Sequence, residues 1–374
     1  MEEVFLTQAF FGAIIVAMEV PSGALADRFG RKRALVLGAL FLALGHMSLL
    51  WVNDLIGFLV FEGLLGVGVS LMSGTDLALL YDTEIELGRE GESPAAVANL
   101  YSMHSLSEAI AAVGCSLLIL HSMDMVIVVQ VVAGCIPLLV ALTLKEPSIH
   151  RAVSGKETLE PLRFREVLVH LLRNGAVIRW TVIALSLWSL TTFFAVWILQ
   201  QWWSETDVPL WAFGYLRAVY TAIAGLAGRF ALRIERRLGI GLLLGIIGLL
   251  PVMGYVGLAA SGLVMGLIAA AGFFIARGPG LVVLRDALNR LTPSRFRATA
   301  NSMASFGFRA AFVIAGPVAG AWIDYAGTAS TLWLLAGVAA IISLGVLLPL
   351  WLAIRRAITA GDDPEGSPCA ASAS

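Results

Sequence analysis

The stretch "EVPSGALADRFGRKRAL" (Glu19–Leu35) joins two long apolar runs and places four cations within residues 28–33. The rest of the chain is strongly apolar, since 59% of its 374 residues are hydrophobic and only 14% are charged. A typical soluble domain carries about 25% charged residues. Apolar runs of about twenty residues recur along the chain, and each is long enough to cross the hydrocarbon of a bilayer as a helix. The composition therefore predicts an all-α polytopic membrane protein that lies in a lipid bilayer.

The apolar runs predict about eleven membrane spans, which is a large number for a chain of 374 residues. We place them at residues 4–26, 34–52, 55–81, 95–120, 124–144, 176–201, 209–232, 238–259, 262–288, 297–322 and 329–354. A polar connection divides them into five spans and six.

This division predicts the domain organisation. We expect an N-terminal bundle at 1–144, a cytoplasmic linker at 145–175, a C-terminal bundle at 176–356 and a disordered tail at 357–374. Within the linker, "FREVLVHLLRN" (Phe164–Asn174) predicts a short amphipathic helix at the membrane surface.

The basic residues predict the orientation of these spans. Lysine and arginine gather in alternate connections, whereas the intervening ones, such as "WWSETDVPLW" (202–211), contain neither. By the positive-inside rule the basic connections and the C-terminus are cytoplasmic. We expect Trp197, Trp202, Trp203 and Trp211 to anchor the chain at the outer interface. The cations form no basic face, so we expect no nucleic-acid partner.

The connection in "GALADRFGRKRAL" resembles the signature loop of the major facilitator superfamily, a G-x-L-x-D-R-x-G-R-K/R pattern between two helices. The matching residues are Gly23, Leu25, Asp27, Arg28, Gly30, Arg31 and Lys32. "LAGRFALR" (Leu226–Arg233) echoes the same loop in the second half of the chain. The resemblance implies two pseudo-symmetric helical bundles and a transporter of the bacterial inner membrane, rather than an enzyme.

The resemblance also implies a cytoplasmic latch made by this loop. In the family, the carboxylate matched by Asp27 faces the N-terminus of a second-half helix, here the tenth span. A loop arginine typically pairs with an acid that ends the fourth helix, which Asp82 matches. We expect Gly23 to allow close helix packing and Gly30 to permit the tight turn. The alternative is that the loop sets only the topology, through its charge.

The family's signature follows its second helix, whereas here it follows the first apolar run. We therefore expect the chain to lack the family's first helix, so that its first five spans match helices two to six. One explanation is that residues upstream of Met1 are omitted from the sequence. The other is a protein with eleven helices, which would put transport in doubt.

Seven ionisable residues fall inside the predicted spans, namely Glu19, Glu62, Asp76, Glu108, Arg217, Arg277 and Arg309. Each costs about 2.5–3.5 kcal/mol at the bilayer centre unless it is paired, hydrated or neutral. The four acids come from the first half and the three cations from the second, so pairing between the halves is one expectation. Structural pairing within the membrane is the alternative to a functional role.

Five of the titratable residues are candidates for proton coupling: Glu19, Asp76, Glu108, Glu62 and His104. Glu19 lies about 12 Å deeper than Asp27 along one helix, which Pro21 is expected to bend. His104 and Glu108 are four residues apart and share a helix face. They could form a proton relay, half of a metal site or a structural pair; we expect no metal and no cofactor other than the proton gradient.

These features lead to a ranked functional hypothesis. We expect a monomeric, proton-coupled transporter of a small organic molecule that works by alternating access. Drug-type efflux is the first choice, because "SGTDLALLYD" (73–82) is similar to bacterial drug-efflux members of the superfamily. Uptake of a metabolite is the second choice, and a non-transporting remnant or membrane sensor is the third.

Overall fold

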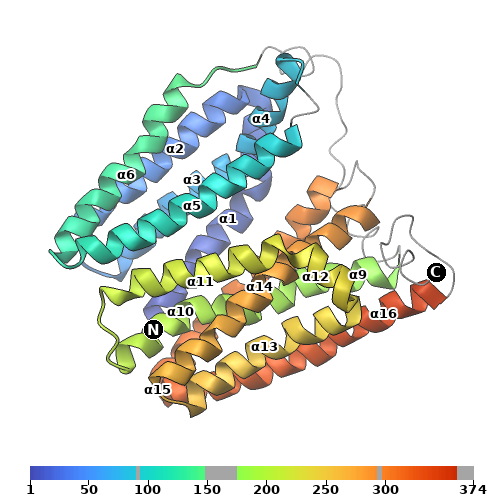
Figure 1. Cartoon of the computed structure of the whole chain (residues 1–374). Helices are drawn as coiled ribbons and strands as arrows, with labels where there is room; N and C mark the ends of the chain where they lie inside the picture. The colour runs from blue at the N-terminus through green and yellow to red at the C-terminus, as the bar shows by residue number, and fades with distance from the viewer. Residues whose placement is uncertain (90–92, 148–174, 293–296, 360–374) are drawn as a thin grey trace. The chain divides into compact units, whose positions relative to one another are not determined.

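The computed structural model describes residues 1–89, 93–147, 175–292 and 297–359, and among them every regular element is helical (Figure 1). The prediction of an all-α membrane protein is confirmed. The predicted amphipathic helix at 164–174 and the predicted tail, from residue 360 onward, lie outside the described residues.

The first half of the chain contributes the helices α1 (Glu2–Phe29), α2 (Arg31–Ser48), η1 (Leu49–Trp51), α3 (Leu55–Met72), α4 (Thr75–Glu86), α5 (Ser93–Leu118) and α6 (Met123–Thr143). The second half contributes α9 (Ala176–Ile183), η3 (Ala184–Trp188), α10 (Ser189–Glu205), α11 (Ala212–Arg229), α12 (Ala231–Leu238), α13 (Ile240–Ala260), α14 (Leu263–Leu291), α15 (Arg297–Ile342), η5 (Ser343–Leu347) and α16 (Leu348–Thr359). The segments η3 and η5 are single π-helical turns inside longer helices.

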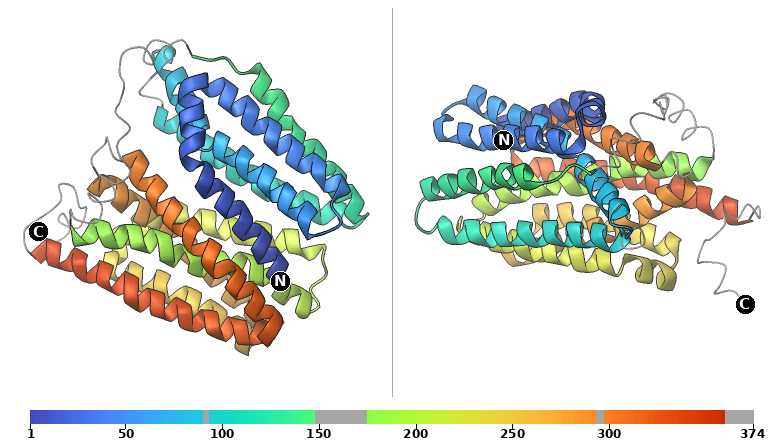
Figure 2. Two further views of the ribbon diagram at one scale, coloured as in Figure 1. Left: turned by 180° about the vertical axis from the view of Figure 1, so that it is seen from behind. Right: turned by 90° about the horizontal axis from the view of Figure 1, so that it is seen from above.

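The chain divides into two compact units. The N-terminal unit is Glu3–Pro161, and the C-terminal unit is Leu162–Ser374 together with Met1–Glu2. Figure 2 shows the helices of each unit from two further directions, and α1 bends along its length there. The helix continues through Pro21 without a break.

In the N-terminal unit α2 packs against both α3 and α6. Two facing glycines bring α2 and α3 together: a Cβ built at Gly68 would lie 2.8 Å from the Gly38 carbonyl oxygen, closer than real side chains approach. Such small residues are a common means of close helix packing in membranes, where backbones can then touch directly. The glycine-rich run at residues 63–74 therefore serves helix packing.

In the C-terminal unit the core forms around Trp188, which is fully buried among apolar residues of α9, α13, α14 and α16. Its indole Nε1 donates to the Ile247 carbonyl oxygen at 3.2 Å, so the buried polar atom is satisfied. Tyr255 on α13 similarly donates to the carbonyl oxygen of Thr191 at 2.6 Å. These bonds fix the neighbouring helices in register.

Seven stretches of the described residues are long and apolar enough to cross a membrane, and one of them, Ala300–Thr359, contains two of the predicted spans. Those two spans meet at Gly327, whose φ of 80° interrupts α15. The predicted span at 55–81 falls within Leu55–Glu86, one of these seven stretches. Its helix is interrupted, because α3 ends at Met72 and α4 begins after Gly74 (φ 78°).

The predicted interfacial role of the tryptophans is wrong for Trp202 and Trp203. They are only 5% and 3% exposed, and Trp202 Nε1 donates to the Leu258 carbonyl oxygen at 3.1 Å. Trp211 is 45% exposed. Sequence position near a helix end did not reveal that Trp202 packs against α13 and α14. It also did not reveal that Trp203 packs against Phe213 and Tyr220 of α11.

Candidate functional site

The signature loop is built around the N-terminus of α2. Gly30 precedes this helix with φ 96°, a conformation that only glycine adopts readily. Both carboxylate oxygens of Glu146 accept hydrogen bonds there, from Arg31 N at 2.8 Å and Lys32 N at 2.7 Å. A carboxylate is favoured at this position because the first N–H groups of a helix lack internal partners and the helix dipole is positive there.

Glu146 also explains why residue 30 must be small. A Cβ built on Gly30 would lie 3.2 Å from the carboxyl atoms of Glu146, which is tighter than an ordinary contact. Sequence analysis missed Glu146. The signal for it was an acid placed directly after the last predicted span of the first half and followed by Pro147.

The side chain of Arg31 joins the loop to α4. Its Nη1 lies 2.6 Å from Asp82 Oδ2, and the two side chains are 20% and 13% exposed. The same nitrogen donates to the Ala78 carbonyl oxygen. The loop arginine and the acid that ends the third predicted span are therefore in contact, and they are partly shielded from water.

The other loop residues contribute less to this cluster. Arg28 is exposed and lies 5.5 Å from the ring centre of Phe29, and Lys32 is half-buried. The side chain of Asp27 lies outside the described part of the chain. A Cβ built on Gly23 meets no described atom within 4 Å, so its expected role in close packing stays a prediction.

Of the membrane acids, Glu62 is the most deeply placed in the described structure. It lies on α3, is 8% exposed and accepts a hydrogen bond from Gln8 Nε2 of α1 at 2.6 Å. A neutral amide can donate to a carboxylate, and after rotation its oxygen can accept from a protonated carboxyl group. The pair can therefore accommodate either protonation state of Glu62.

The remaining proton candidates lie in different surroundings. Glu19 is half-buried on α1. Asp76 is exposed in the first turn of α4, where its Oδ1 accepts from Leu77 N at 2.7 Å. It lies beyond the break at Gly74, on another helix than Glu62. On α5, His104 is exposed and Glu108 is half-buried. Glu19, Asp76 and the pair of His104 and Glu108 thus lie on three helices, α1, α4 and α5, whereas Glu62 lies on α3.

In the C-terminal unit Arg277 lies beside a small polar cavity. Its Nη1 donates to Thr192 Oγ1 at 3.1 Å, and its guanidinium carbon is 5.9 Å from the ring centre of Phe193. Aromatic rings attract a cation at this distance. The other predicted membrane cations, Arg217 on α11 and Arg309 on α15, are half-buried.

The cavity beside Arg277 has a volume of about 90 Å³. It is lined by residues of η3, α10, α14 and α15: Leu185, Ser189, Arg277, Leu281, Arg285, Asn301, Ala304, Ser305 and Phe308. Ser189 is only 6% exposed, and its hydroxyl finds no hydrogen-bond partner among the described residues. A buried hydroxyl left without a partner is costly, so this group is suited to bind a ligand atom.

The glycines of "RGPG" (277–280) position Arg277 through backbone packing. A Cβ at Gly278 would lie 2.2 Å from the Ala224 carbonyl oxygen of α11, and one at Gly280 would lie 2.1 Å from the Trp188 ring. Both contacts need glycine. They hold α14 against α11 on one side and against the buried indole on the other, so the backbone next to Arg277 is fixed in position.

Helical spans in two compact units, a charged signature loop and ionisable groups within the spans together define a polytopic membrane transporter. Residues 3–286, more than half of the chain, match the Major Facilitator Superfamily. The chain belongs to this superfamily, whose members are transporters and not enzymes. It is a multi-pass membrane protein with a small-molecule substrate.

Known proteins support the same assignment. An uncharacterized transporter of Buchnera aphidicola subsp. Schizaphis graminum is 31% identical over 77 residues, which are 21% of this chain and 19% of that protein. The nucleoside transporter NupG has a similar structure, with a TM-score of 0.71 and 13% identity over 94% of this chain and 90% of NupG.

Two further solved structures share the fold. A POT family transporter in complex with 5-aminolevulinic acid has a TM-score of 0.68 and 16% identity, covering 93% of this chain and 87% of that one. A D-xylose-proton symporter has a TM-score of 0.64 and 14% identity, covering 91% and 85%. At these identities the likeness shows the fold alone.

Proposed function

We propose that this chain is a proton-coupled secondary transporter that exports a small organic molecule by alternating access. The proton gradient is its energy source, and no further cofactor is required. The observation that carries proton coupling is the burial of Glu62 in α3 next to the single amide of Gln8. Burial disfavours the charged form of a carboxyl group, and a neutral partner does not compensate for that as a cation would.

The cavity beside Arg277 supports the substrate side of the proposal. It combines the cations Arg277 and Arg285 with two hydroxyls and the Asn301 amide, beside four apolar side chains. Polar groups that converge on a pocket fix the orientation of a small-molecule ligand. A substrate that presents an oxygen atom to Arg277 and Ser189 would satisfy both side chains.

The contact between Arg31 and Asp82 supports the proposed role of the signature loop. We propose that this cluster, with Gly30 and Glu146, holds the cytoplasmic ends of α1, α2, α4 and α6 together as one body during the transport cycle.

We propose further that the chain lies in the bacterial inner membrane with its C-terminus in the cytoplasm. A fluorescent protein fused after Ser374 should therefore fluoresce, whereas an alkaline phosphatase fusion at the same place should be inactive.

Uptake by symport is the second candidate, since the D-xylose-proton symporter shares the fold. Proton flux measured in vesicles containing the purified protein separates the two. Export by exchange predicts that substrate added on one side drives protons out of the vesicle as substrate enters, whereas symport predicts that protons and substrate enter together. A library of amphiphilic drugs and of metabolites should be screened, and no substrate-dependent proton movement in either direction would contradict the proposal.

A further inference from the structure

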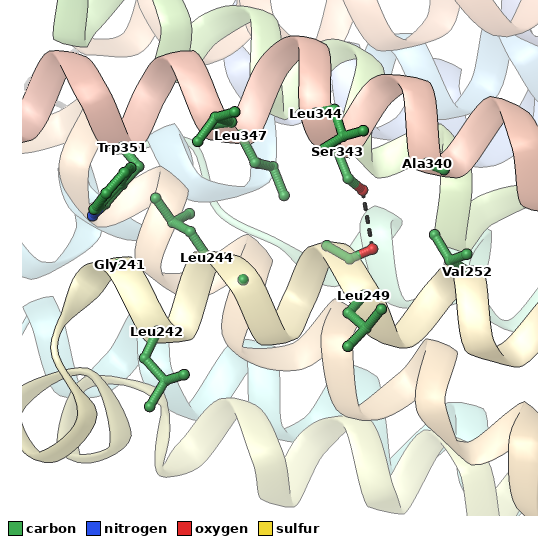
Figure 3. A pocket seen from close by; sticks show the side chains of 13 residues that line it. Gly241, Leu242, Leu244, Leu249, Val252, Ala340, Ser343, Leu344, Leu347 and Trp351 are labelled. Atoms are coloured by element: carbon green, nitrogen blue, oxygen red, sulfur yellow. Dashed lines mark hydrogen bonds between the residues drawn. The ribbon is translucent and has the colours of Figure 1, made fainter.

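A long apolar groove runs along the C-terminal unit between α13 and the helix formed by α15, η5 and α16 (Figure 3). Its volume is about 550 Å³. Leu242 and Leu249 project from α13 and Leu344 from η5, and these side chains are 56%, 57% and 66% exposed. None of the 13 residues that line the groove is charged.

Glycines on one face of α13 create the groove. Gly241, Gly245 and Gly248 follow one another at helical spacing, so this face of α13 carries side chains only at positions such as Leu244 and Val252. A Cβ built at Gly245 meets no described atom within 4 Å, which shows that the space is open. Farther along, Ser343 Oγ donates to the Gly248 carbonyl oxygen at 3.0 Å and ties the two walls together (Figure 3).

The groove has the length of one membrane leaflet. The eleven residue steps from Gly241 to Val252 span about 16 Å along a helix, which is about half the thickness of the hydrocarbon core. An acyl chain from a single leaflet therefore matches its extent.

Charge distinguishes one end of the groove from the other. The indole of Trp351 covers Gly241, so the start of α13 and the end of α16 meet there. Arg237 precedes α13 at this end, and Arg355 follows Trp351 by one helical turn, with its guanidinium 5.6 Å from the indole ring centre. Both arginines are exposed. The opposite end lies among the apolar residues 249–256 and 336–342.

We propose that this groove binds one acyl chain of an anionic phospholipid, with the headgroup phosphate bound by Arg237 and Arg355. Arginine can bind phosphate through two parallel hydrogen bonds. Basic groups between helices at the cytoplasmic side of a membrane commonly bind anionic headgroups, and the arginine pattern predicts that this end is cytoplasmic. The site is separate from the cavity beside Arg277, and it does not depend on the direction of transport.

The test uses the purified full chain in detergent micelles, with bound lipid counted by native mass spectrometry. Phosphatidylglycerol and phosphatidylcholine with identical acyl chains are titrated in parallel. We expect phosphatidylglycerol to bind more tightly than phosphatidylcholine. Arg237→Gln and Arg355→Gln should each weaken phosphatidylglycerol binding by about fivefold. Lys145→Gln, which removes an exposed cation from the other unit, should leave its binding unchanged.

Filling the groove tests the acyl-chain part separately. Gly245→Leu should reduce binding of both lipids, because the new side chain enters open space in the groove. Gly337→Leu is the matched control: its Cβ also meets no described atom within 4 Å, and Gly337 does not line the groove. Equal binding of the two lipids by the native chain would overturn the proposal, as would unchanged lipid binding by a folded Gly245→Leu variant. A dimer that Gly245→Leu abolishes would also overturn it, because a second copy would then occupy the groove.

Discussion

Arg31 and Asp82 form an ion pair between the first turn of α2 and α4, with Nη1 and Oδ2 2.6 Å apart. The arginine also donates to the Ala78 carbonyl oxygen, so it connects a loop to both the side chain and the backbone of α4. Arg31 belongs to the signature loop that resembles the superfamily's, and Asp82 lies on α4.

Exchange of these charges tests whether the pair acts as a unit. Arg31→Gln and Asp82→Asn should each lower stability by about 1–2 kcal/mol, because the partner left behind is partly shielded from water. Both should slow transport. Arg31→Asp combined with Asp82→Arg should recover part of the loss. Thermal unfolding and vesicle transport measure the two effects, and Arg33→Gln is the exposed control; a double variant as poor as the sum of its parts would argue against direct coupling.

The contact of Gly30 with Glu146 can be separated from the cost of a positive φ angle. Gly30→Ala and Gly239→Ala both force alanine into the same positive-φ conformation, at φ 96°, ψ 152° and φ 77°, ψ 153°. This strain costs about 1–3 kcal/mol per residue, and a Cβ at Gly239 meets no described atom within 4 Å. Only residue 30 also crowds a carboxylate, so Gly30→Ala should be the more destabilising of the two in thermal unfolding. In a Glu146→Ala background the difference should disappear; if it persists, the crowding explanation is wrong.

Glu62 is expected to carry the transported proton. Glu62→Gln keeps the size of the side chain and its ability to form hydrogen bonds, but glutamine cannot ionise. Transport driven by a proton gradient should therefore fall to the level seen without a gradient. Exchange of labelled for unlabelled substrate should continue. Glu19→Gln and Asp76→Asn are compared in the same vesicles, because both residues were candidates from sequence. If Glu19→Gln or Asp76→Asn loses gradient-driven transport while Glu62→Gln stays fully active, the substituted residue carries the proton and Glu62 does not.

Ser189 is expected to affect binding and stability in opposite directions. Its buried hydroxyl has no partner among the described residues, so Ser189→Ala should leave stability unchanged or raise it by about 1 kcal/mol while weakening substrate binding. Ser186→Ala is the control, because Ser186 Oγ already donates to the Val182 carbonyl oxygen at 2.9 Å. Substrate-dependent shifts in melting temperature measure both properties. Normal substrate binding by Ser189→Ala would exclude the hydroxyl from the site.

The pH dependence of stability should contain a contribution from Glu235 on α12. Burial raises the pKa of this carboxyl group and Asp286 raises it further, against the opposing effects of Arg290 and Arg236. The folded state therefore holds the proton more tightly than the unfolded chain, and this contribution to stability declines as pH rises above the ordinary pKa of 4.5. Glu235→Gln should raise the melting temperature more at pH 8 than at pH 5. An equal shift at both pH values would contradict this assignment.

The sequence alone determined the class of the protein, most of the helices and the signature loop. Each of these depends on properties that are local along the chain: the length of an apolar run, the positions of arginine and lysine, and a spaced motif around Gly30. A bilayer imposes a minimum helix length and a charge asymmetry on any chain that crosses it, so these patterns are visible without knowledge of contacts.

Only the tertiary structure decided which side chains meet. Glu146 reaches Arg31 across 115 residues of sequence, and Gln8 reaches Glu62 across 54. Hydropathy records whether a residue prefers lipid or water, but it does not record its partner. For the same reason the burial of Trp202, the unpartnered hydroxyl of Ser189 and the open groove at Gly245 became apparent only once neighbouring helices were in place, since each depends on the surface that a second helix presents.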